Sequence, residues 1–360
     1  MSRLNPHPPI APPMPHTLRR RRSSGLRLAL LLPIIVVGFC QAIPTEAASV
    51  AAKPLRAGVA RVEITNREAG PVNDPLYAKA LVLTDGTVTA ILVTLDVVAL
   101  AEIGPIPSGY LAEVRGRLKR ELNIEPSNVL INSSHCHGIV CADVADRTVR
   151  AVREASRSLV PVVVGAGAGR EDRIMENRRL KLKDGTESDV RHAYSLPPDE
   201  AVAEAGPIDP EIGILRIDRE DGRTLAVVYN FACHPIQGVP SGGNTADLVG
   251  FASRAIEDGL GGGAVALFVQ GCGGDINPIG YKDFDPPRDA EPLGNLLGLS
   301  TLRALRTIRC TPDARLAIRD ETISLPRADL ARRIAEREAE QARLVRSLQG
   351  TTLSLKSFLP

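Results

Sequence analysis

Residues 129–138 have the sequence VLINSSHCHG, in which a short apolar run leads directly into a pair of histidines. The run over 129–132 has the length and the β-branched composition of a buried strand. His135 and His137 follow it two residues apart, and in extended backbone such side chains point to the same face. The pattern therefore predicts either half of a zinc site or a structural histidine pair.

Three more apolar runs end in polar or glycine-rich sequence. The run 88–95 is followed by Asp96, and the run 225–232 is followed by Cys233 and His234. The run 264–269 is followed by QGCGGDINP at 270–278. Ligands of open α/β sheets gather beyond the carboxyl ends of the strands. We therefore expect His135 and His234 to converge there, and zinc favours neutral imidazole ligands. Asp96 is expected either to orient a ligand or to cap the following segment.

The glycine-rich sequence can bring consecutive backbone amides close to an anion. Gly273 and Gly274 permit such an approach, so their amides predict an oxyanion cradle, with an ordinary glycine-rich turn as the alternative. Competing motifs are weak or absent. The chain has no H-E-x-x-H, G-x-x-x-x-G-K or G-x-S-x-G sequence, and GAGAG at 165–169 lacks the third glycine of the dinucleotide fingerprint.

Strand-like runs alternate with helical patterns from residue 55 onward, which indicates an α/β fold. A further apolar run covers 160–164, and helical patterns cover 109–122, 146–158, 248–258 and 292–308. We expect stacked or mixed β-sheets flanked by helices, with the active site at the C-terminal ends of the strands. Residues 171–207 are polar and are expected to form an irregular active-site loop, in which His192 is a solvated side chain.

The N-terminal segment is expected to direct export. Arginines at 19–22 and 27 precede the apolar run 28–39, and small residues follow, which is the order of a secretory signal. The run is shorter than a bilayer span, and an uncleaved signal anchor is the alternative. We expect 1–48 to be this signal, 55–322 to be the catalytic domain and 323–360 to be a charged helix and tail. The protein would then be periplasmic or secreted.

Composition excludes several function classes. Outside the six arginines of residues 1–27, the chain holds 38 basic and 42 acidic residues, so it has no electrostatic basis for binding nucleic acid. Five Tyr, six Phe and no Trp also argue against base-stacking platforms. The cysteines form no C-x-x-C pair, and five lie outside the expected signal, so neither a disulfide framework nor a zinc knuckle is indicated.

Seven motifs occur in order between residues 55 and 310. They are AGVARVEIT at 57–65, DPLYAKAL at 74–81, SHCH at 134–137, NRR at 177–179, CHP at 233–235, AD at 246–247 and GDINP at 274–278. Together they resemble the N-terminal catalytic domain of the neutral/alkaline non-lysosomal ceramidase family. The resemblance implies hydrolysis of an amide bond with one zinc ion as cofactor. It also implies a lipid-like or other N-acyl small-molecule substrate and transient contact with a membrane surface, and it suggests no protein partner.

The resemblance also implies roles for individual residues. His135 and His234 correspond to the two zinc-binding histidines of the family, His137 lies beside the substrate amide, and Arg178 corresponds to the site arginine. Zinc would polarise the carbonyl and acidify a water molecule, while His137 and Arg178 stabilise charge. The amides of 273–275 would face the developing oxyanion, with Asp275 in the catalytic set and Asp96 and Asp247 in support.

Two departures from the family bear on activity. The serine of the family motif is replaced by Asn277, which has no nucleophilic hydroxyl and can at most donate a hydrogen bond. The family also supplies a Glu and a Tyr zinc ligand, and no match to either occurs before Pro360. The leading interpretation is an exported zinc-dependent hydrolase of amide or ester bonds. The alternatives are an inactive ceramidase-like domain that binds a ligand or partner without turnover, and an unrelated α/β protein with structural histidines.

Overall fold

A computed structural model describes residues 54–101, 106–189, 197–238, 243–279, 289–312 and 314–347. The expected export signal at 1–48 and His192 lie outside these residues. In the ranges that are described, no helix has the length and apolar character needed to cross a membrane.

The largest element is an eight-stranded sheet with the order β12-β11-β10-β5-β1-β2-β3-β4. In chain order its strands are β1 (Arg56–Glu63), β2 (Tyr77–Thr84), β3 (Thr89–Leu95), β4 (Val129–Ser133), β5 (Val160–Arg170), β10 (Glu211–Arg219), β11 (Thr224–Phe231) and β12 (Val265–Gln270). The β3–β4 and β11–β12 pairs are parallel and the other pairs are antiparallel. The sheet is therefore mixed, as the sequence predicts.

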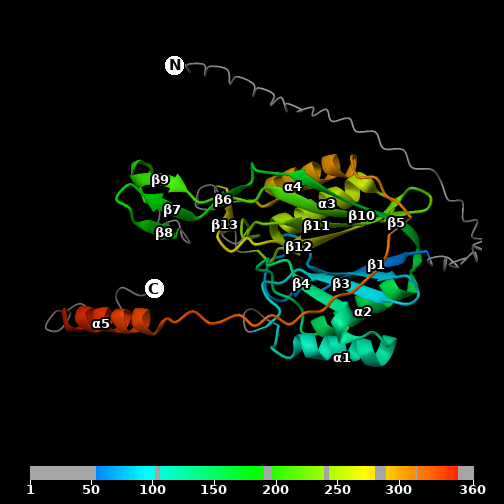
Figure 1. Ribbon diagram of the computed structural model, residues 1–360, viewed down its shortest axis with the longest axis horizontal. Coiled ribbons are helices and arrows are strands. Elements are labelled where there is room, and N and C mark those ends of the chain that lie inside the picture. Colours follow the sequence, from blue (N-terminus) through cyan, green and yellow to red (C-terminus); the bar gives the residue numbers. More distant parts are fainter. Residues whose placement is uncertain are drawn as a thin grey trace, which may run out of the picture. The chain divides into compact units, whose positions relative to one another are not determined.

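The sheet consists of two four-stranded halves that pack face to face. The halves are joined where β1 pairs with β5 through only two residue pairs, and a core cluster that includes Ala57, Leu81, Leu225 and Leu267 draws on both of them. Helices α1 (Tyr110–Leu122) and α2 (Val144–Arg157) share a second core cluster with the β1–β4 half. Helices α3 (Asp247–Leu260) and α4 (Glu291–Leu305) share a third with the β5–β12 half. The layers follow the order helix, sheet, sheet, helix (Figure 1).

The outer strands of the two halves meet along a seam. The Thr94 hydroxyl donates to the Phe268 carbonyl at 2.7 Å, and Asn132 Nδ2 donates to the same carbonyl at 3.1 Å. The Gln270 amide donates to Asn132 Oδ1 at 3.2 Å. These contacts place the carboxyl ends of β3, β4 and β12 at one edge of the fold.

A buried ion pair also joins the two halves. Lys79 Nζ on β2 lies 2.9 Å from Glu257 Oε1 on α3, and the two side chains are 7% and 9% exposed. Lys79 also donates to the Ala266 carbonyl at 2.9 Å, and Arg61 on β1 pairs with the other oxygen of Glu257. A polar cavity of about 450 Å³ lies beside this group and reaches Asp96.

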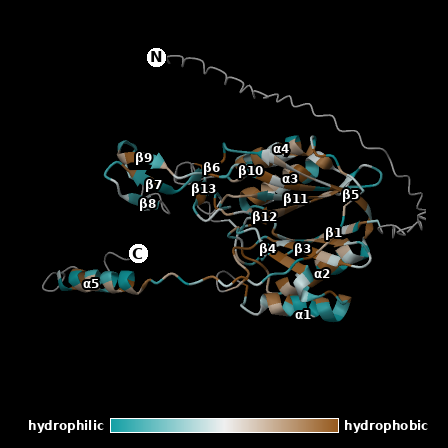
Figure 2. Ribbon diagram, viewed as in Figure 1, coloured by the Kyte–Doolittle hydropathy of each residue, from teal (hydrophilic) through white to brown (hydrophobic). Residues whose placement is uncertain are grey.

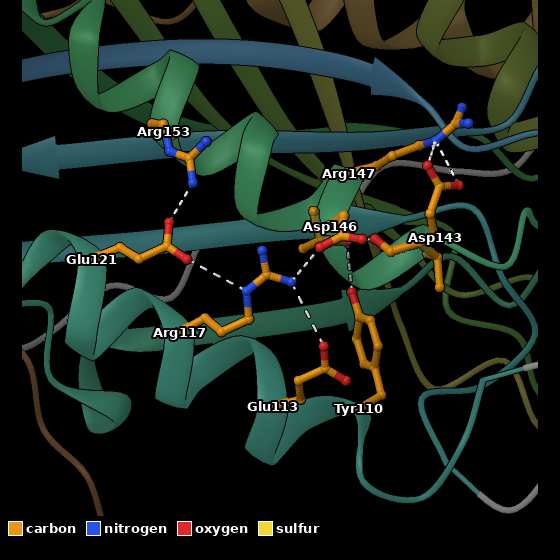
Figure 3. A network of polar contacts seen from close by, with 10 residues as sticks. Tyr110, Glu113, Arg117, Glu121, Asp143, Asp146, Arg147 and Arg153 are labelled. Atoms are coloured by element: carbon orange, nitrogen blue, oxygen red, sulfur yellow. Dashed lines mark hydrogen bonds and ion pairs between the residues drawn. The ribbon is translucent and has the colours of Figure 1, made fainter.

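A polar network connects the exposed faces of α1 and α2 (Figure 3). Arg117 Nη1 lies 2.6 Å from Asp146 Oδ1 and 3.7 Å from Glu113, and Arg117 Nε lies 3.5 Å from Glu121. Arg153 pairs with the other oxygen of Glu121. The apolar residues of these helices face the sheet instead, and Figure 2 shows the hydrophilic character of the outer faces.

The predicted helices and strand-like runs are all confirmed, whereas the irregular loop over 171–207 is wrong. That segment contains β6 (Met175–Asn177), which pairs with β13 (Ile276–Pro278). It also contains a small sheet of β8 (Glu187–Asp189), β7 (Arg179–Leu182) and β9 (Val202–Ala205) and a 3-10 turn (Asp199–Ala201). The strands of the small sheet are mostly exposed, so they lack the apolar alternation by which a strand is recognised in sequence.

Glycines extend β5 beyond the predicted end of its apolar run. A Cβ on Gly165 would lie 2.4 Å from the Arg309 carbonyl, and one on Gly167 would lie 2.7 Å from Ile308. The GAGAG sequence therefore allows the chain after α4 to pack closely on this strand. The predicted charged helix is observed as α5 (Ala331–Ser347), and none of its residues is buried.

Candidate functional site

Two histidines from opposite halves of the sheet meet at the shared strand edge. His135 follows the end of β4, and His234 follows the end of β11. Their Nε2 atoms lie 3.0 Å apart, and their ring centroids lie 4.7 Å apart. The structure thus brings together the two residues for which the sequence predicts a metal site.

Both imidazoles are oriented by backbone carbonyls. His135 Nδ1 lies 2.6 Å from the Val98 carbonyl, and His234 Nδ1 lies 2.6 Å from the Gly273 carbonyl. A carbonyl can only accept, so each Nδ1 carries the proton and each Nε2 of a neutral ring presents a lone pair. Two lone pairs that face one another at this distance repel unless a proton or a cation lies between them. Carbonyl-anchored imidazoles are a common support for metal-binding histidines, so the pair fits zinc.

Among the described residues, only these two imidazoles are placed together as possible metal ligands. No group of three His, Cys, Asp or Glu side chains that could hold a metal occurs in the residues that the structure covers. Zinc sites in proteins usually have three or four protein ligands. The residues present therefore fit part of a zinc site.

His135 has an unusual backbone conformation. Its φ is +67°, in the left-handed region that non-glycine residues rarely adopt, and its amide donates to the Val97 carbonyl at 2.9 Å. Such a conformation costs about 1–3 kcal/mol and persists only where surrounding contacts impose it. The turn directs the His135 ring toward His234, and it means that the chain is not extended through the H-x-H motif.

His137 lies beside the pair without joining it. Its ring centroid is 5.8 Å from that of His135, in an edge-on arrangement. Burial, and then the proximity of His135, lower the pKa of His137 below the usual value. The lowered pKa favours the neutral form of the His137 imidazole, which can accept a proton.

Arg178 lies between β6 and β7. Its amide donates to the Asp275 carbonyl at 2.8 Å, and its Nε lies 3.1 Å from Asp189 Oδ1. Burial lowers the pKa of His234, the hydrogen bond with the Gly273 carbonyl opposes this shift, and the electrostatic influence of His135 and Arg178 lowers the pKa further. The Arg178 guanidinium thus disfavours protonation of the His234 imidazole.

The glycine-rich turn after β12 supports His234 through a carbonyl. The Gly273 amide donates to the Gly271 carbonyl at 2.8 Å, and the Gly273 carbonyl accepts from the Ile276 amide at 3.1 Å as well as from His234. The Gly273 amide is thus engaged within the turn. Gly274 is exposed, and a Cβ at this position would meet no atom within 4 Å. The carboxylate of Asp275 lies 3.7 Å from Arg179 Nε.

Asn277 is fully buried in β13, with 0% exposure. Neither its Nδ2 nor its Oδ1 has a hydrogen-bond partner among the described residues. A buried polar atom without a partner costs about 1–3 kcal/mol, so native proteins keep few of them without a function. Asn277 directly follows Ile276, whose carbonyl accepts from the His234 amide at 2.9 Å, so the unpaired amide lies next to a residue that holds His234.

Asp96 and Asp247 are buried supports of the surrounding loops. Asp96 accepts from the Tyr77 amide at 2.8 Å, and Asp247 accepts from the Gly238 amide at 2.7 Å and the Leu248 amide at 2.7 Å. Burial raises the pKa of each carboxyl to about 6.

Sequence reasoning missed three features of the site. Two are the carbonyls of Val98 and Gly273, which no side-chain pattern marks. The third is Asp189, which lies in the polar segment that resembles a loop.

Comparisons with known proteins agree with this architecture. No family model matches the chain, and no curated protein matches it. Two matching solved structures are a neutral ceramidase from Pseudomonas aeruginosa and a ceramidase complexed with C2. Each has a TM-score of 0.55 and 18% identity over 71% of this chain, which covers 45% of the first structure and 44% of the second. The chain therefore has a fold like that of these ceramidases over 71% of its length, and it spans less than half the length of these neighbours.

Proposed function

We propose that this protein is an exported, zinc-dependent hydrolase of amide or ester bonds in lipid-like N-acyl substrates. The observation that carries the proposal is the facing pair of Nε2 lone pairs of His135 and His234, 3.0 Å apart at the strand edge. The ceramidase-like fold supports the reaction class. The signal-like sequence of residues 1–48 supports export.

The side chains around the pair suit acyl transfer to water. When bound, zinc supplies Lewis-acid polarisation of the acyl carbonyl. Neutral His137 can take a proton from an attacking water molecule and return it to the leaving amine. The charge of Arg178 and the unpaired amide of Asn277 can stabilise negative charge that develops on the acyl oxygen. Asn277 cannot act as a nucleophile, so water must fill that role.

A second candidate function is a ligand-binding domain without turnover. It is favoured by the asparagine at position 277 and by the two-histidine donor set of the described residues. The ligand would occupy the same site, since the unpaired Asn277 amide and the charge of Arg178 remain available to it.

Metal analysis combined with turnover separates these functions. We expect the purified full chain to retain about one zinc ion per molecule after dialysis and to hydrolyse N-acyl sphingosine or shorter N-acyl amides slowly. Zinc retention without turnover on short and long acyl chains would favour the binding domain. Absence of zinc from both the wild type and the His135/His234 double variant would contradict the metal assignment.

A further inference from the structure

The small sheet of β7, β8 and β9 is tied to the turn that supports His234. The Arg179 amide donates to Asn177 Oδ1 at 2.8 Å, and the Gly206 amide donates to the Arg179 carbonyl at 2.9 Å. Asn177 Nδ2 donates to the Pro207 carbonyl at 2.7 Å. Both ends of the small sheet are therefore fixed at β6, which pairs with β13 (Figure 1).

Arg178 receives a counter-ion from this small sheet. Asp189 at the end of β8 places Oδ1 at 3.1 Å from Arg178 Nε, and the arginine side chain is only 14% exposed. The contact is an ion pair by distance and lacks hydrogen-bond geometry, because Nε has no hydrogen-bond partner among the described residues. Asp275 does not compete for this role, because it offers Arg178 its carbonyl and its carboxylate lies nearest to Arg179. Arg178 is thus paired with Asp189, and Arg179 is paired with Asp275.

We propose that Asp189 is a positioning residue for Arg178, and that the pair makes the site select substrates that carry no negative charge beside the scissile bond. The inference rests on the proposed function and names its substrate class. An anionic group next to the acyl bond would have to displace Asp189 from the guanidinium or lie beside the carboxylate. Either arrangement weakens the binding of an anionic substrate, because it breaks the Arg178–Asp189 ion pair or places two negative charges side by side. A neutral amide meets no such penalty and still reaches the guanidinium.

The test compares a neutral and an anionic ligand of equal acyl length. Binding of N-dodecanoylethanolamine and N-dodecanoylglycine to the zinc-treated full chain is measured by calorimetry, and hydrolysis of both is followed in parallel. Asp189→Asn is expected to raise the affinity for the glycine conjugate relative to the ethanolamine conjugate about 5- to 20-fold, because it leaves Arg178 uncompensated. Where turnover occurs, the change should lie in KM rather than in kcat.

Three further variants test whether the effect is specific to the Asp189–Arg178 pair. Glu187→Gln removes the same charge from the same strand two residues away, and it should leave the ligand preference unchanged. Arg178→Met in the Asp189→Asn background should abolish the gain. Asp189→Glu should restore the wild-type preference, which loss of folding would not do.

The outcomes distinguish this inference from the proposed function. A shifted binding preference without hydrolysis supports the inference and contradicts the enzyme. Hydrolysis with an unchanged preference supports the enzyme and overturns the inference. An equal shift in Glu187→Gln, or no binding of either ligand to any variant, also overturns it.

Discussion

Asn277 has an amide side chain at the position where the family that the sequence resembles has a serine. Its two polar side-chain atoms have no hydrogen-bond partner among the described residues. If it stabilises charge on the acyl oxygen, Asn277→Ala should lower kcat about 10²- to 10³-fold, the usual effect of losing one such donor. The free energy of unfolding should not fall, because the change also removes two unpaired polar atoms. Steady-state kinetics and urea unfolding measure both effects. Equal activity in the variant and the wild type would remove Asn277 from the site.

His135 and His234 should be required for metal retention. His135→Asn is the suitable change at the first position, since asparagine tolerates the left-handed backbone observed there. We expect this variant and His234→Ala each to reduce zinc occupancy, measured by atomic absorption after dialysis. His192→Ala is the control, because the sequence predicts a solvated side chain there. Full occupancy in both site variants would show that the histidine pair is structural.

Asp96 should give stability a dependence on pH. Burial raises its pKa from 3.8 to about 6, although Lys79 opposes the shift. Between about pH 4 and pH 6 the folded state therefore binds more protons than the unfolded state, and the free energy of unfolding falls as pH rises. Asp96→Asn should flatten this fall by about 1–3 kcal/mol in urea titrations. Part of the pH dependence should remain in this variant, because burial also raises the pKa of Asp247 to about 6.

Asp85→Asn provides the control for this measurement. Hydrogen bonds from Thr87 and Val88 lower the pKa of Asp85 to about 2. The stability it contributes is present above pH 3.8 and is lost as the pH falls toward 2, outside the window that Asp96 controls. An identical flattening in both variants would contradict the assignment to Asp96.

Side chains at strand ends were predictable from sequence, whereas their orientation was not. The position of His135 and His234 after apolar runs was enough to expect them at one edge of the sheet. The positive φ of His135 and its hydrogen bond to the Val98 carbonyl depend on the backbone that follows β3, which lies outside the local sequence pattern. The proposed role of Asp189 could not be predicted for a similar reason, because it depends on a contact with Arg178, which lies on a neighbouring segment.

At the level of elements, the buried strands and the amphipathic helices could be predicted because burial imposes a period on their sequences. Strands β1, β2 and β10 were not identified, although β1 and β2 lie within quoted motifs. The small sheet was missed because its strands are exposed and polar. The seam that joins β3 and β4 to β12 depends on the Thr94 and Asn132 side chains, and these contacts produce no periodic pattern in the sequence.

The Lys79–Glu257 pair should matter more for stability than the exposed network on α1 and α2. Glu257→Gln leaves the ammonium of Lys79 buried without a carboxylate, which typically costs about 3–5 kcal/mol. The double variant Lys79→Met/Glu257→Gln should recover much of that loss. Arg117→Ala, on the exposed network, should cost about 1 kcal/mol or less. Denaturant unfolding of the four proteins would contradict this ranking if Arg117→Ala were the most destabilised.

At the level of the whole molecule, the two histidines belong to different halves of the sheet, so metal binding and docking of the halves should be thermodynamically linked. Zinc at 100 times its dissociation constant should raise the free energy of unfolding by about 2.7 kcal/mol. Thermal melts with and without zinc measure this shift, and the His135→Asn/His234→Ala variant should not show it. A shift of the same size in that variant would place the metal elsewhere.

The separation of the two histidines along the chain also orders the events of biogenesis. His135 and His234 are 99 residues apart, and the seam that unites them requires β12, which follows both. A chain that emerges N-terminus first presents His135 alone, and a single imidazole retains zinc weakly. Under the proposed metal site, the ion is captured only after β12 has docked, since a preformed site rarely exists in an unfolded chain. Zinc occupancy would then indicate that this part of the chain has completed folding.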